Sequence, residues 1–253
     1  ICYFHENQLT YPMADDRDRD YQYGMTNITS CLAADAVWFN SRFHLNDFLD
    51  GAEWLLGKMP DFAPEHVIAD IRDKAAVYPP PVLARRVDRT DWKTRDVPTI
   101  LWCHRWEYDK NPEPFFDALL RLAQTGYNFR LVLLGQRFRT VPPVFASSWD
   151  RLRPSIVHTG HIPDPVEYQS ALADCDIVVS TAIQENFGIA VVEAILAGCQ
   201  PLLPDRLVYP EIIPKRFHQT CLYPSDADLL GRLRNALAGP GRMTPASIAE
   251  LQD

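Results

Sequence analysis

The sequence contains no apolar run close to the roughly 18 residues that a membrane-spanning helix requires. It also lacks internal repeats with a short fixed period and low-complexity segments. With 253 residues, of which 47% are hydrophobic, the chain is long enough for two ordinary domains. We therefore expect a soluble, globular protein that does not associate with a membrane.

The cysteine and histidine patterns indicate neither a disulfide framework nor a metal site. The six cysteines are scattered, form no Cys-x2-Cys pair and mostly stand in apolar surroundings, which favours reduced, buried thiols. His158 and His161 have no third cysteine or histidine ligand nearby. We expect a cytoplasmic protein with no metal and no bound cofactor, and the sequence leaves the oligomeric state open.

Charge is unevenly distributed along the chain. The formal net charge of −8 argues against a surface built entirely for nucleic acid but leaves room for a local basic face. Basic residues are in local excess in residues 85–95, and further arginines occur between residues 121 and 153. The simpler interpretation of each excess is a solvated surface.

From residue 98 onward, short β-rich runs alternate with helical patterns, which is typical of βαβ units and a parallel sheet. The expected strands are 99–103, 129–134, 176–180 and 201–203, and the expected helices are 113–124, 165–173 and 187–197. Ligands of such α/β sheets bind at the carboxyl ends of the strands. The residues expected there are Arg105, Gly135, Gly160 and Glu185.

The earlier part of the chain repeats this pattern more weakly, with strands up to residue 4 and at 36–39 and helices around 28–34 and 41–49. Prolines 79–81 then interrupt it, because three consecutive prolines cannot continue a helix or a central strand. We predict two domains, residues 1–82 and 83–253, with a cleft between them. The chain opens in a strand without an initiator methionine and closes inside a Thr244-capped helix, so we expect a fragment whose first domain is incomplete.

Two glutamates flank a turn and the start of an apolar helix. Eight helical residues rise about 12 Å and rotate about 80° past two full turns, so Glu185 and Glu193 can lie on one broad face. A carboxylate accepts hydrogen bonds from a vicinal diol, and the amides around Phe187, Gly188 and Ile189 would form a helix N-terminus that can receive phosphate. These features suggest a nucleotide sugar; alternatively, Glu185 only caps the helix and Glu193 is solvated.

Charged groups in this region need partners. Glu193 lies within an apolar helix, where an unpaired carboxylate would be costly, so we expect a partner for it. Arg105 and Lys110 follow the strand at 99–103 on one loop, where two fixed cations can neutralise a leaving diphosphate. The alternative is an arginine and a lysine on a solvated loop.

In combination, these motifs resemble the retaining glycosyltransferases of family four, which have the GT-B fold. The resemblance spans roughly residues 98–215 and rests on Arg105 with Lys110, Gly135, His158-Thr159-Gly160-His161, Asp174-Cys175-Asp176 with Ser180, Glu185 with Glu193, and Ala197-Gly198. It implies an α/β protein of two Rossmann-like parallel-sheet domains that face a cleft. It also implies that Glu185 holds donor-sugar hydroxyls, Glu193 the ribose, and the two cations the diphosphate. The full expected donor site is Arg105, Lys110, Gly135, Gly160, Glu185, Asn186, Phe187, Gly188, Ile189 and Glu193.

A second, narrower resemblance concerns the start of the chain. Residues 3–12, with residues 184–188 and 207–211, are similar to the tRNA-queuosine α-mannosyltransferases. That resemblance implies GDP-mannose as the donor substrate and queuosine in the aspartate tRNA as the acceptor. Acceptor-side contacts are expected from His5, Glu6, Asn7, Gln8, Arg137 and Arg139. His5, at the end of a strand, can donate to a sugar hydroxyl or a developing charge, although it can also be an ordinary loop histidine.

The leading hypothesis is therefore a retaining transfer of mannose from GDP-mannose to queuosine in tRNA(Asp), with His5, Arg105, Lys110 and Glu185 as the catalytic groups. One alternative is a family-four hexosyltransferase that acts on a lipid, a glycan or a small molecule, because these proteins share the donor half. Another is a nucleotide- or RNA-binding protein without catalysis.

Overall fold

A computed structural model describes residues 1–13, 20–60, 62–64, 66–82, 97–238, 243–244, 246–247 and 250. The chain divides into two compact units, one formed by residues 1–81 with 184–187 and the other by residues 82–183 with 188–253. The basic stretch at residues 85–95 and most of the C-terminal helix predicted from Thr244 lie outside the described residues.

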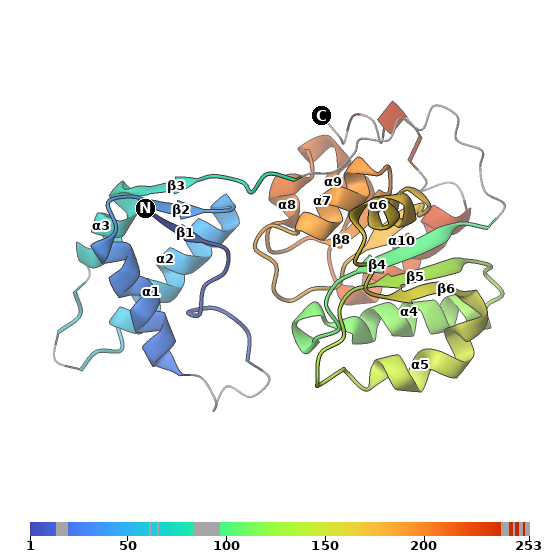
Figure 1. Ribbon diagram of the computed structural model, residues 1–253, viewed down its shortest axis with the longest axis horizontal. Helices are drawn as coiled ribbons and strands as arrows, with labels where there is room; N and C mark the ends of the chain where they lie inside the picture. Colours follow the sequence, from blue (N-terminus) through green and yellow to red (C-terminus); the bar gives the residue numbers. More distant parts are fainter. Residues whose placement is uncertain are drawn as a thin grey trace. The chain divides into compact units, whose positions relative to one another are not determined.

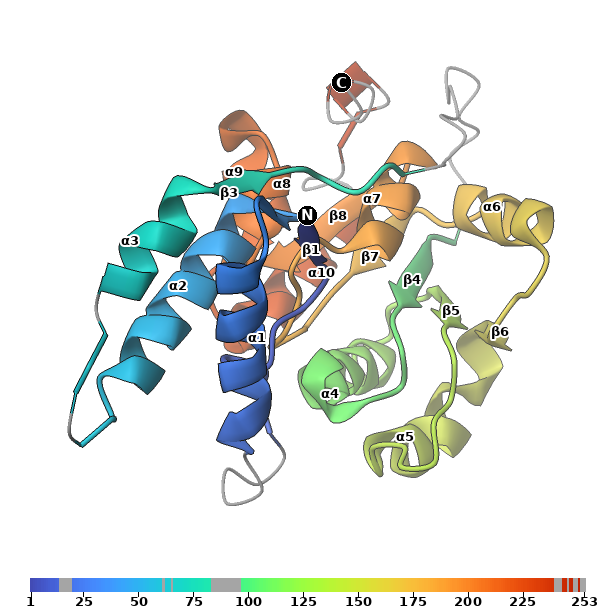
Figure 2. The same cartoon turned by 60° about the vertical axis from the view of Figure 1, so that its left-hand side comes forward.

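The first unit contains a three-stranded parallel sheet with the order β1-β2-β3. Three helices, which lie side by side, complete it (Figures 1 and 2). Its elements are β1 (Cys2–Phe4), α1 (Tyr21–Ala33), β2 (Val37–Phe39), α2 (Arg42–Leu56), α3 (His66–Asp73) and β3 (Ala75–Val77). The predicted strands and helices are confirmed, with longer helices than expected, whereas α3 and β3 were not predicted.

Aromatic packing joins the sheet of this unit to α2. The rings of Phe4 and Phe39 stack with centroids 5.3 Å apart, and Phe48 of α2 lies 5.2 Å from both. Helix α2 begins where it does because the Ser41 side chain accepts a hydrogen bond from the backbone N–H of His44 at 3.0 Å. The cap sets the start of α2, and Phe48 on its apolar side packs on the sheet.

The second unit is built on a six-stranded parallel sheet with the order β6-β5-β4-β7-β8-β9. Its strands are β4 (Thr99–Cys103), β5 (Arg130–Leu134), β6 (Ile156–Gly160), β7 (Ile177–Val179), β8 (Gln200–Pro204) and β9 (Leu222–Tyr223). The α/β class with parallel sheets is thereby confirmed. The chain enters the sheet near its middle, adds strands on one side, and after β6 returns to β7 on the other side of β4.

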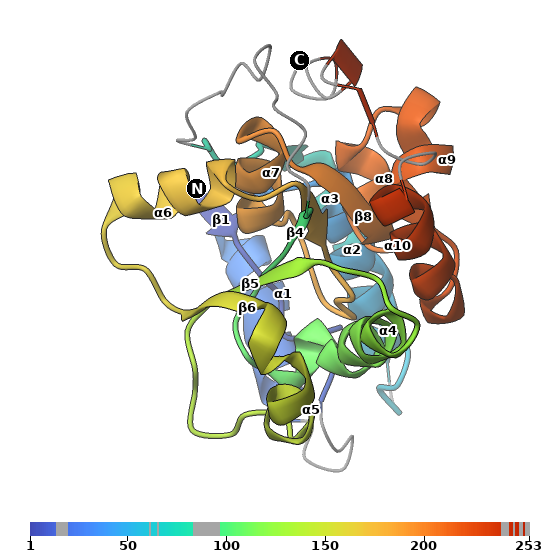
Figure 3. The same cartoon turned by 90° about the vertical axis from the view of Figure 1, so that its right-hand side faces the viewer.

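Helices cover both faces of this sheet. They are α4 (Pro112–Gln124), α5 (Val144–Leu152), α6 (Pro165–Ala173), α7 (Ile189–Leu196), α8 (Tyr209–Ile212), α9 (His218–Cys221) and α10 (Leu229–Ala238), with short 3-10 helices η2 (Tyr108–Lys110), η3 (Arg153–Ser155), η4 (Lys215–Phe217) and η5 (Asp226–Asp228). Helices α4 and α5 lie on one face, and α6 and α7 on the other (Figures 1 and 3). Helix α6 begins and ends at the predicted residues, while α5, β6, β9 and α10 were not predicted.

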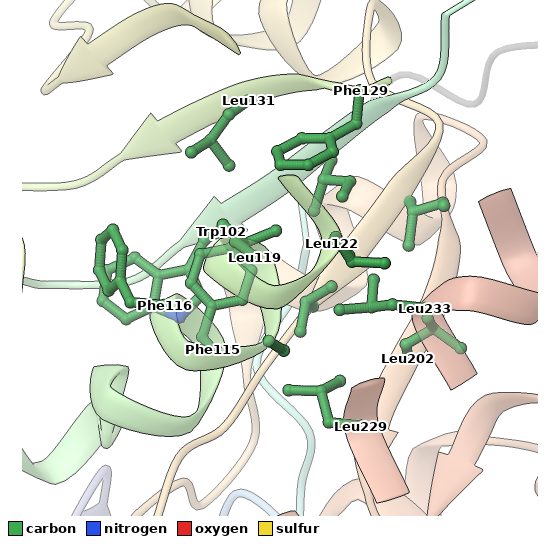
Figure 4. Close-up of a cluster of buried hydrophobic side chains, with 14 of the residues drawn as sticks. Trp102, Phe115, Phe116, Leu119, Leu122, Phe129, Leu131, Leu202, Leu229 and Leu233 are labelled. Atoms are coloured by element: carbon green, nitrogen blue, oxygen red, sulfur yellow. The ribbon is translucent and has the colours of Figure 1, made fainter. Parts of the chain in front are cut away.

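The main core lies between the sheet and helices α4, α5 and α10. Alternate strand residues, including Trp102, Leu131 and Leu202, point into it (Figure 4), as the two-residue period of a strand requires. Phe115 and Leu119, one helical turn apart on α4, meet them from the other side. This packing fixes the strands whose carboxyl ends carry the predicted site residues.

Candidate functional site

Three predicted residues stand where the sheet topology of the second unit places ligand-binding groups, and a fourth follows further along the chain. Arg105 is the second residue after β4, Gly135 directly follows β5, and Gly160 ends β6. Glu185 follows β7 by six residues. The predicted positions of Arg105, Gly135 and Gly160 at the carboxyl ends of strands are confirmed, whereas Glu185 groups with the first unit. The roles of all four stay predictions.

Gly135 lets the loops after β4 and β5 approach closely. Its φ of 139° is in the region that favours glycine. A Cβ atom at this position would lie 1.8 Å from the backbone oxygen of His104. The N–H of Gly135 also donates to the oxygen of Gly160 at 3.1 Å. The loops after β4 and β5 therefore approach so closely at residue 135 that no side chain fits there.

Arg105 and Lys110 are both held by carboxylates of their own loop. The Nζ of Lys110 lies 3.2 Å from the carboxylate of Asp109, whose side chain is 1% exposed. Arg105 contacts Glu107 at 3.2 Å and Asp109 at 3.9 Å. The Lys110 side chain is 9% exposed, but that of Arg105 is 46% exposed. The structure brings the two predicted cations together around one buried acid, so Lys110 is not freely solvated, whereas Arg105 remains partly in contact with solvent.

The loop after β7 fixes the backbone beneath these cations. The N–H of Ile183 donates to the oxygen of Asp109 at 2.9 Å, and the Thr181 hydroxyl donates to the oxygen of Lys110 at 3.0 Å. Arg206 in turn donates to the backbone oxygen of Thr181 at 2.9 Å and forms an ion pair with Asp226 of η5 at 3.1 Å. The position of Lys110 therefore depends on loops from three strands.

His104 adds no positive charge to this site. Its side chain is buried, and its ring makes an edge contact with Trp102 at 5.1 Å between centroids. Burial, reinforced by the positive charge of Lys110, lowers the pKa of His104 to about 3. The imidazole is therefore neutral at pH 7, and the local positive charge resides on Arg105 and Lys110.

The predicted acceptor-side arginines follow Gly135 on an exposed loop. The Arg137 guanidinium lies 4.3 Å from the ring centroid of Trp106 and donates to the Thr159 hydroxyl at 3.2 Å. Arg139 is exposed. Arg137 is thus fixed against the protein by stacking and a hydrogen bond, whereas Arg139 extends into solvent.

Glu193 has the partner that its apolar surroundings require. The Tyr168 hydroxyl, from α6, donates to Glu193 Oε2 at 2.9 Å. Burial raises the pKa of Glu193 above its ordinary value, and the hydrogen bond from Tyr168 opposes that rise. Glu193 itself is half-buried. The prediction that this carboxylate is paired is confirmed.

The predicted helical relationship between the two glutamates is wrong. Helix α7 begins at Ile189, after Gly188, which caps it in the left-handed conformation with φ 79°. Glu185 therefore lies outside the helix, and residues 184–187 group with the first unit. Glycine tolerates this conformation at a small cost, so the chain turns sharply there and the regular rise and rotation of a helix do not relate Glu185 to Glu193.

In the first unit, the backbone at His5 is tied to polar side chains. The oxygen of His5 accepts hydrogen bonds from Asn40 Nδ2 at 2.9 Å and from Asn186 Nδ2 at 3.5 Å. Asn40 Oδ1 also lies 2.8 Å from Nδ1 of the buried His44. Burial lowers the pKa of His44 to about 4, and the nearby His5 adds to that effect. The predicted residues His5 and Asn186 thus lie together, and the His5 ring remains exposed directly after β1.

Asn7 shapes the loop in which it lies. Its Oδ1 accepts from the N–H groups of Leu9 and Thr10 at 3.0 and 3.1 Å and from the Thr10 hydroxyl at 3.1 Å. Its amide nitrogen lies 3.4 Å from Asp47 Oδ2, which also accepts a hydrogen bond from the Thr10 hydroxyl. Because the side chain is buried and its oxygen is occupied, Asn7 holds the loop instead of presenting a polar group to solvent.

The other predicted residues of the first unit are Glu6, Gln8, Glu185 and Phe187. Glu6 and Gln8 are exposed, and the backbone N–H of Gln8 donates to Asn27 Oδ1 at 2.8 Å. Glu185 and Phe187 are half-buried. Nothing in this geometry tests their roles, which stay predictions.

Sequence reasoning missed two side chains that hold predicted residues. Asp109 stands next to Lys110 in the sequence, and an acid beside a lysine is the signal that could have predicted this ion pair. Tyr168 is separated from Glu193 by 25 residues and lies on another helix. Only the expectation that Glu193 needs a partner pointed toward it.

The cysteines are thiols, as predicted: none of the six forms a disulfide, and five are buried. In the described part of the chain, no three side chains from His, Cys, Asp and Glu form a group that could hold a metal ion. Among the same residues, no helix has the length and apolar character needed to cross a bilayer.

Two protein families match the sequence, one in each half. Residues 1–82 match the family described as tRNA-queuosine alpha-mannosyltransferase N-terminal. Residues 85–244 match the family described as glycosyl transferases group 1. Both resemblances inferred from the motifs are confirmed.

Individual relatives agree with these matches. A Drosophila melanogaster protein named tRNA-queuosine alpha-mannosyltransferase is 40% identical over 224 residues, which cover 85% of this chain and 59% of the relative. A Mycobacterium tuberculosis GDP-mannose-dependent alpha-(1-6)-phosphatidylinositol dimannoside mannosyltransferase is 27% identical over 128 residues, or 49% of this chain and 32% of that protein. The chain thus spans less than two thirds of the length of these relatives.

Solved structures show the same fold. Sucrose-phosphate synthase from Thermosynechococcus elongatus superposes with a TM-score of 0.70 at 17% identity, covering 99% of this chain and 63% of that one. HepE from Anabaena, in complex with UDP and glucose, gives a TM-score of 0.71 at 13% identity, covering 99% and 65%. The chain therefore has part of the GT-B fold. Because residues 85–244 are more than half of its length, it belongs to the glycosyl transferases group 1 family.

Proposed function

We propose that this protein transfers mannose from GDP-mannose to queuosine in tRNA(Asp), with retention of the anomeric configuration. The observation that carries this proposal is the match of residues 1–82 to the N-terminal family of tRNA-queuosine alpha-mannosyltransferases. The 40% identical Drosophila melanogaster relative, which bears that name, supports it.

Arg105 and Lys110 would bind the diphosphate of the donor. Both side chains lie on the loop after β4, and the buried carboxylate of Asp109 holds them in place before any ligand binds. Preorganised cations stabilise charge that develops on a leaving group without having to reorganise during the reaction. The neutral imidazole of His104 adds no competing charge. This is the chemistry that departure of a nucleoside diphosphate requires.

In the proposed reaction, the oxygen of an acceptor hydroxyl forms a bond to the anomeric carbon of the mannose. The bond from that carbon to the β-phosphate oxygen breaks on the same face, and the departing oxygen takes the proton of the acceptor. GDP leaves with the bonding electron pair, and Arg105 and Lys110 stabilise its charge. The proposed reaction assigns no carboxylate as a nucleophile.

The remaining residues divide into donor and acceptor roles. Glu193 would accept hydrogen bonds from the ribose, since a carboxylate binds two neighbouring hydroxyls, and Glu185 would hold hydroxyls of the mannose. His5 would act on the acceptor side. Arg139, exposed on the loop after β5, would contact tRNA phosphates.

The experiment is mass spectrometry of tRNA nucleosides after incubation with GDP-mannose. The protein should be expressed at its full natural length and supplied with queuosine-containing tRNA. We expect a mass increase of one hexose on queuosine, and about 10² to 10³ times slower formation of this product with Arg105→Ala under the same conditions. Unmodified queuosine, combined with sugar transfer to another acceptor, would contradict the acceptor assignment and leave glycosyl transfer standing.

One observation favours a second candidate. The Mycobacterium tuberculosis relative is named as acting on a phosphatidylinositol dimannoside, so a lipid-linked acceptor is the alternative within the family. The same assay distinguishes the two when a phosphatidylinositol mannoside replaces the tRNA. Nucleotide binding without transfer to either acceptor would indicate a non-catalytic binding protein.

A further inference from the structure

The two carboxylate oxygens of Glu193 have different surroundings. Oε2 accepts the hydrogen bond from Tyr168 at 2.9 Å. Among the described residues, none hydrogen-bonds Oε1, and Oε1 is not one of the buried polar atoms that lack a partner. One oxygen is therefore committed to the protein, and the other is accessible and available to a ligand.

Tyr168 is itself rigidly placed. It lies on α6, which Asp164 caps by accepting from the N–H groups of Val166 and Glu167 at 2.9 and 2.8 Å. The backbone N–H of Tyr168 donates to the Asp164 oxygen at 2.9 Å. Burial raises the pKa of the Tyr168 hydroxyl, so this group stays protonated and can only donate to the carboxylate.

The helix that carries Glu193 is fixed as well. Helix α7 packs on β7 and β8 and contacts α6, and the thiol of Cys103 on β4 lies 3.6 Å from the oxygen of Ala190. With the backbone held, the remaining freedom of Glu193 is rotation of its own side chain. The hydrogen bond from Tyr168 removes that freedom and selects which oxygen is presented.

We propose that Tyr168 is a positioning residue, which turns Glu193 so that Oε1 accepts hydrogen bonds from the ribose hydroxyls of a nucleoside diphosphate and so selects ribonucleotides over dideoxyribonucleotides. This inference rests on the proposed function, because it assumes that the ligand is a nucleoside diphosphate. It adds a residue, on a different helix, to the recognition of the sugar ring.

The same hydrogen bond affects protonation. Only an ionised carboxylate accepts at both oxygens, and Tyr168 opposes the rise in the pKa of Glu193 that burial causes. Among the described residues, the other titratable groups that act on the pair are the thiols of Cys103 and Cys199. Without the tyrosine hydroxyl, the pKa of Glu193 rises further. Binding through Glu193 is lost as pH falls through that pKa, so the loss then begins at a higher pH.

The test is calorimetric titration with GDP and with 2′,3′-dideoxyguanosine diphosphate. We expect the wild type to bind GDP more tightly than the dideoxy compound. Tyr168→Phe should weaken GDP binding by about ten- to a hundredfold, the value of one hydrogen bond to a charged group, and leave binding of the dideoxy compound unchanged. The matched control is Tyr127→Phe, a half-buried tyrosine that packs against the main core of the same unit.

Two further measurements separate positioning from a general structural effect. In a Glu193→Ala background, Tyr168→Phe should cause no additional loss of affinity, because the two side chains act as one unit. The decline of GDP affinity with falling pH should also begin at a higher pH in Tyr168→Phe than in the wild type.

The inference is overturned if Tyr168→Phe binds GDP with wild-type affinity and pH dependence, or if it loses affinity for both nucleotides equally. A wild type that binds the dideoxy compound as tightly as GDP also overturns it, while the proposed function survives. A wild type that binds neither nucleotide contradicts the proposed function itself and removes the basis of the inference.

Discussion

The ammonium group of Lys110 lies 3.2 Å from the carboxylate of Asp109, and both side chains are almost completely buried. Neither charge is stable alone at such a position, because removal from water costs several kcal/mol per ion. Each therefore supports the other before any ligand is present. The pair is both part of the folded unit and part of the candidate donor site.

Asp109→Asn should destabilise the second unit by on the order of 3 kcal/mol, because it leaves a buried cation without its carboxylate. Asp117→Asn is the matched control: its ion pair with Arg121 is exposed, at 61% and 59%, and should contribute less than about 1 kcal/mol. Urea unfolding measures both. Equal losses of stability for the two variants would show that burial does not matter for the Asp109 pair.

Arg105→Ala should lower turnover at saturating donor by about 10² to 10³, the cost of losing one preorganised donor to the leaving group. The unfolding curve should change little, because nearly half of this side chain is exposed. Steady-state kinetics with the full-length protein give the value. A rate close to that of the wild type would remove Arg105 from the mechanism.

Gly135→Ala should strongly disrupt the site, since a Cβ atom would lie 1.8 Å from the His104 oxygen at a backbone φ of 139°. The cost should exceed about 2 kcal/mol and reduce nucleotide binding, because the loops after β4 and β5 must separate. Gly231→Ala, in α10 with open space around it, should instead stabilise by up to about 1 kcal/mol. Thermal unfolding distinguishes these opposite signs.

Glu193→Gln should make the protein more stable at neutral pH while weakening nucleotide binding. Burial raises the pKa of Glu193 above its ordinary value of 4.5, so the folded state holds the proton more tightly than the unfolded state. The stability of the wild type therefore falls as pH rises from the ordinary pKa to the raised pKa of the folded state. The neutral amide of the variant avoids this loss. Melting temperatures of the two proteins should converge below about pH 4.5 and separate above it. A constant difference at every pH would contradict the assignment.

Arg139→Glu should weaken binding of tRNA and reduce the slope of log affinity against log salt by about one for each phosphate that the protein no longer neutralises. GDP affinity should be unaffected. The control is Arg121→Glu, an exposed arginine on α4. If both reversals have the same effect on tRNA binding, the loop after β5 has no special part in acceptor recognition.

The sequence predicts those parts of the fold that have strong local signals. Strand β4 and helix α6 begin and end where their patterns predict, because an apolar β-rich run and an aspartate-proline start are local features. Helix α5 and strand β6 were missed since their apolar positions are interrupted by polar and charged residues. Their stability comes from packing against β5 and α4, which no local window contains.

The candidate site divides in the same way. The positions of Arg105 and Gly135 follow from the ends of strands, so topology alone predicts them. The hydrogen bond between Tyr168 and Glu193 joins two helices and depends on how they pack, which spacing along the chain does not determine. The error at Glu185 has a single cause: a left-handed glycine at 188 delays the start of α7 by two residues relative to the prediction.

The return of the chain from β6 to β7 also has a consequence for folding. Strand β4 pairs with β7 through Ile100 and Ile177, and two other strands and three α-helices lie between them in the chain. Contacts of such large sequence separation form slowly, because the entropy of closing a long loop is lost before the pairing is gained. Thr181 and Ile183, which fix the Lys110 loop, follow β7 and reach their places only then. Protection by GDP against proteolysis during refolding should therefore appear late, once the sheet is complete.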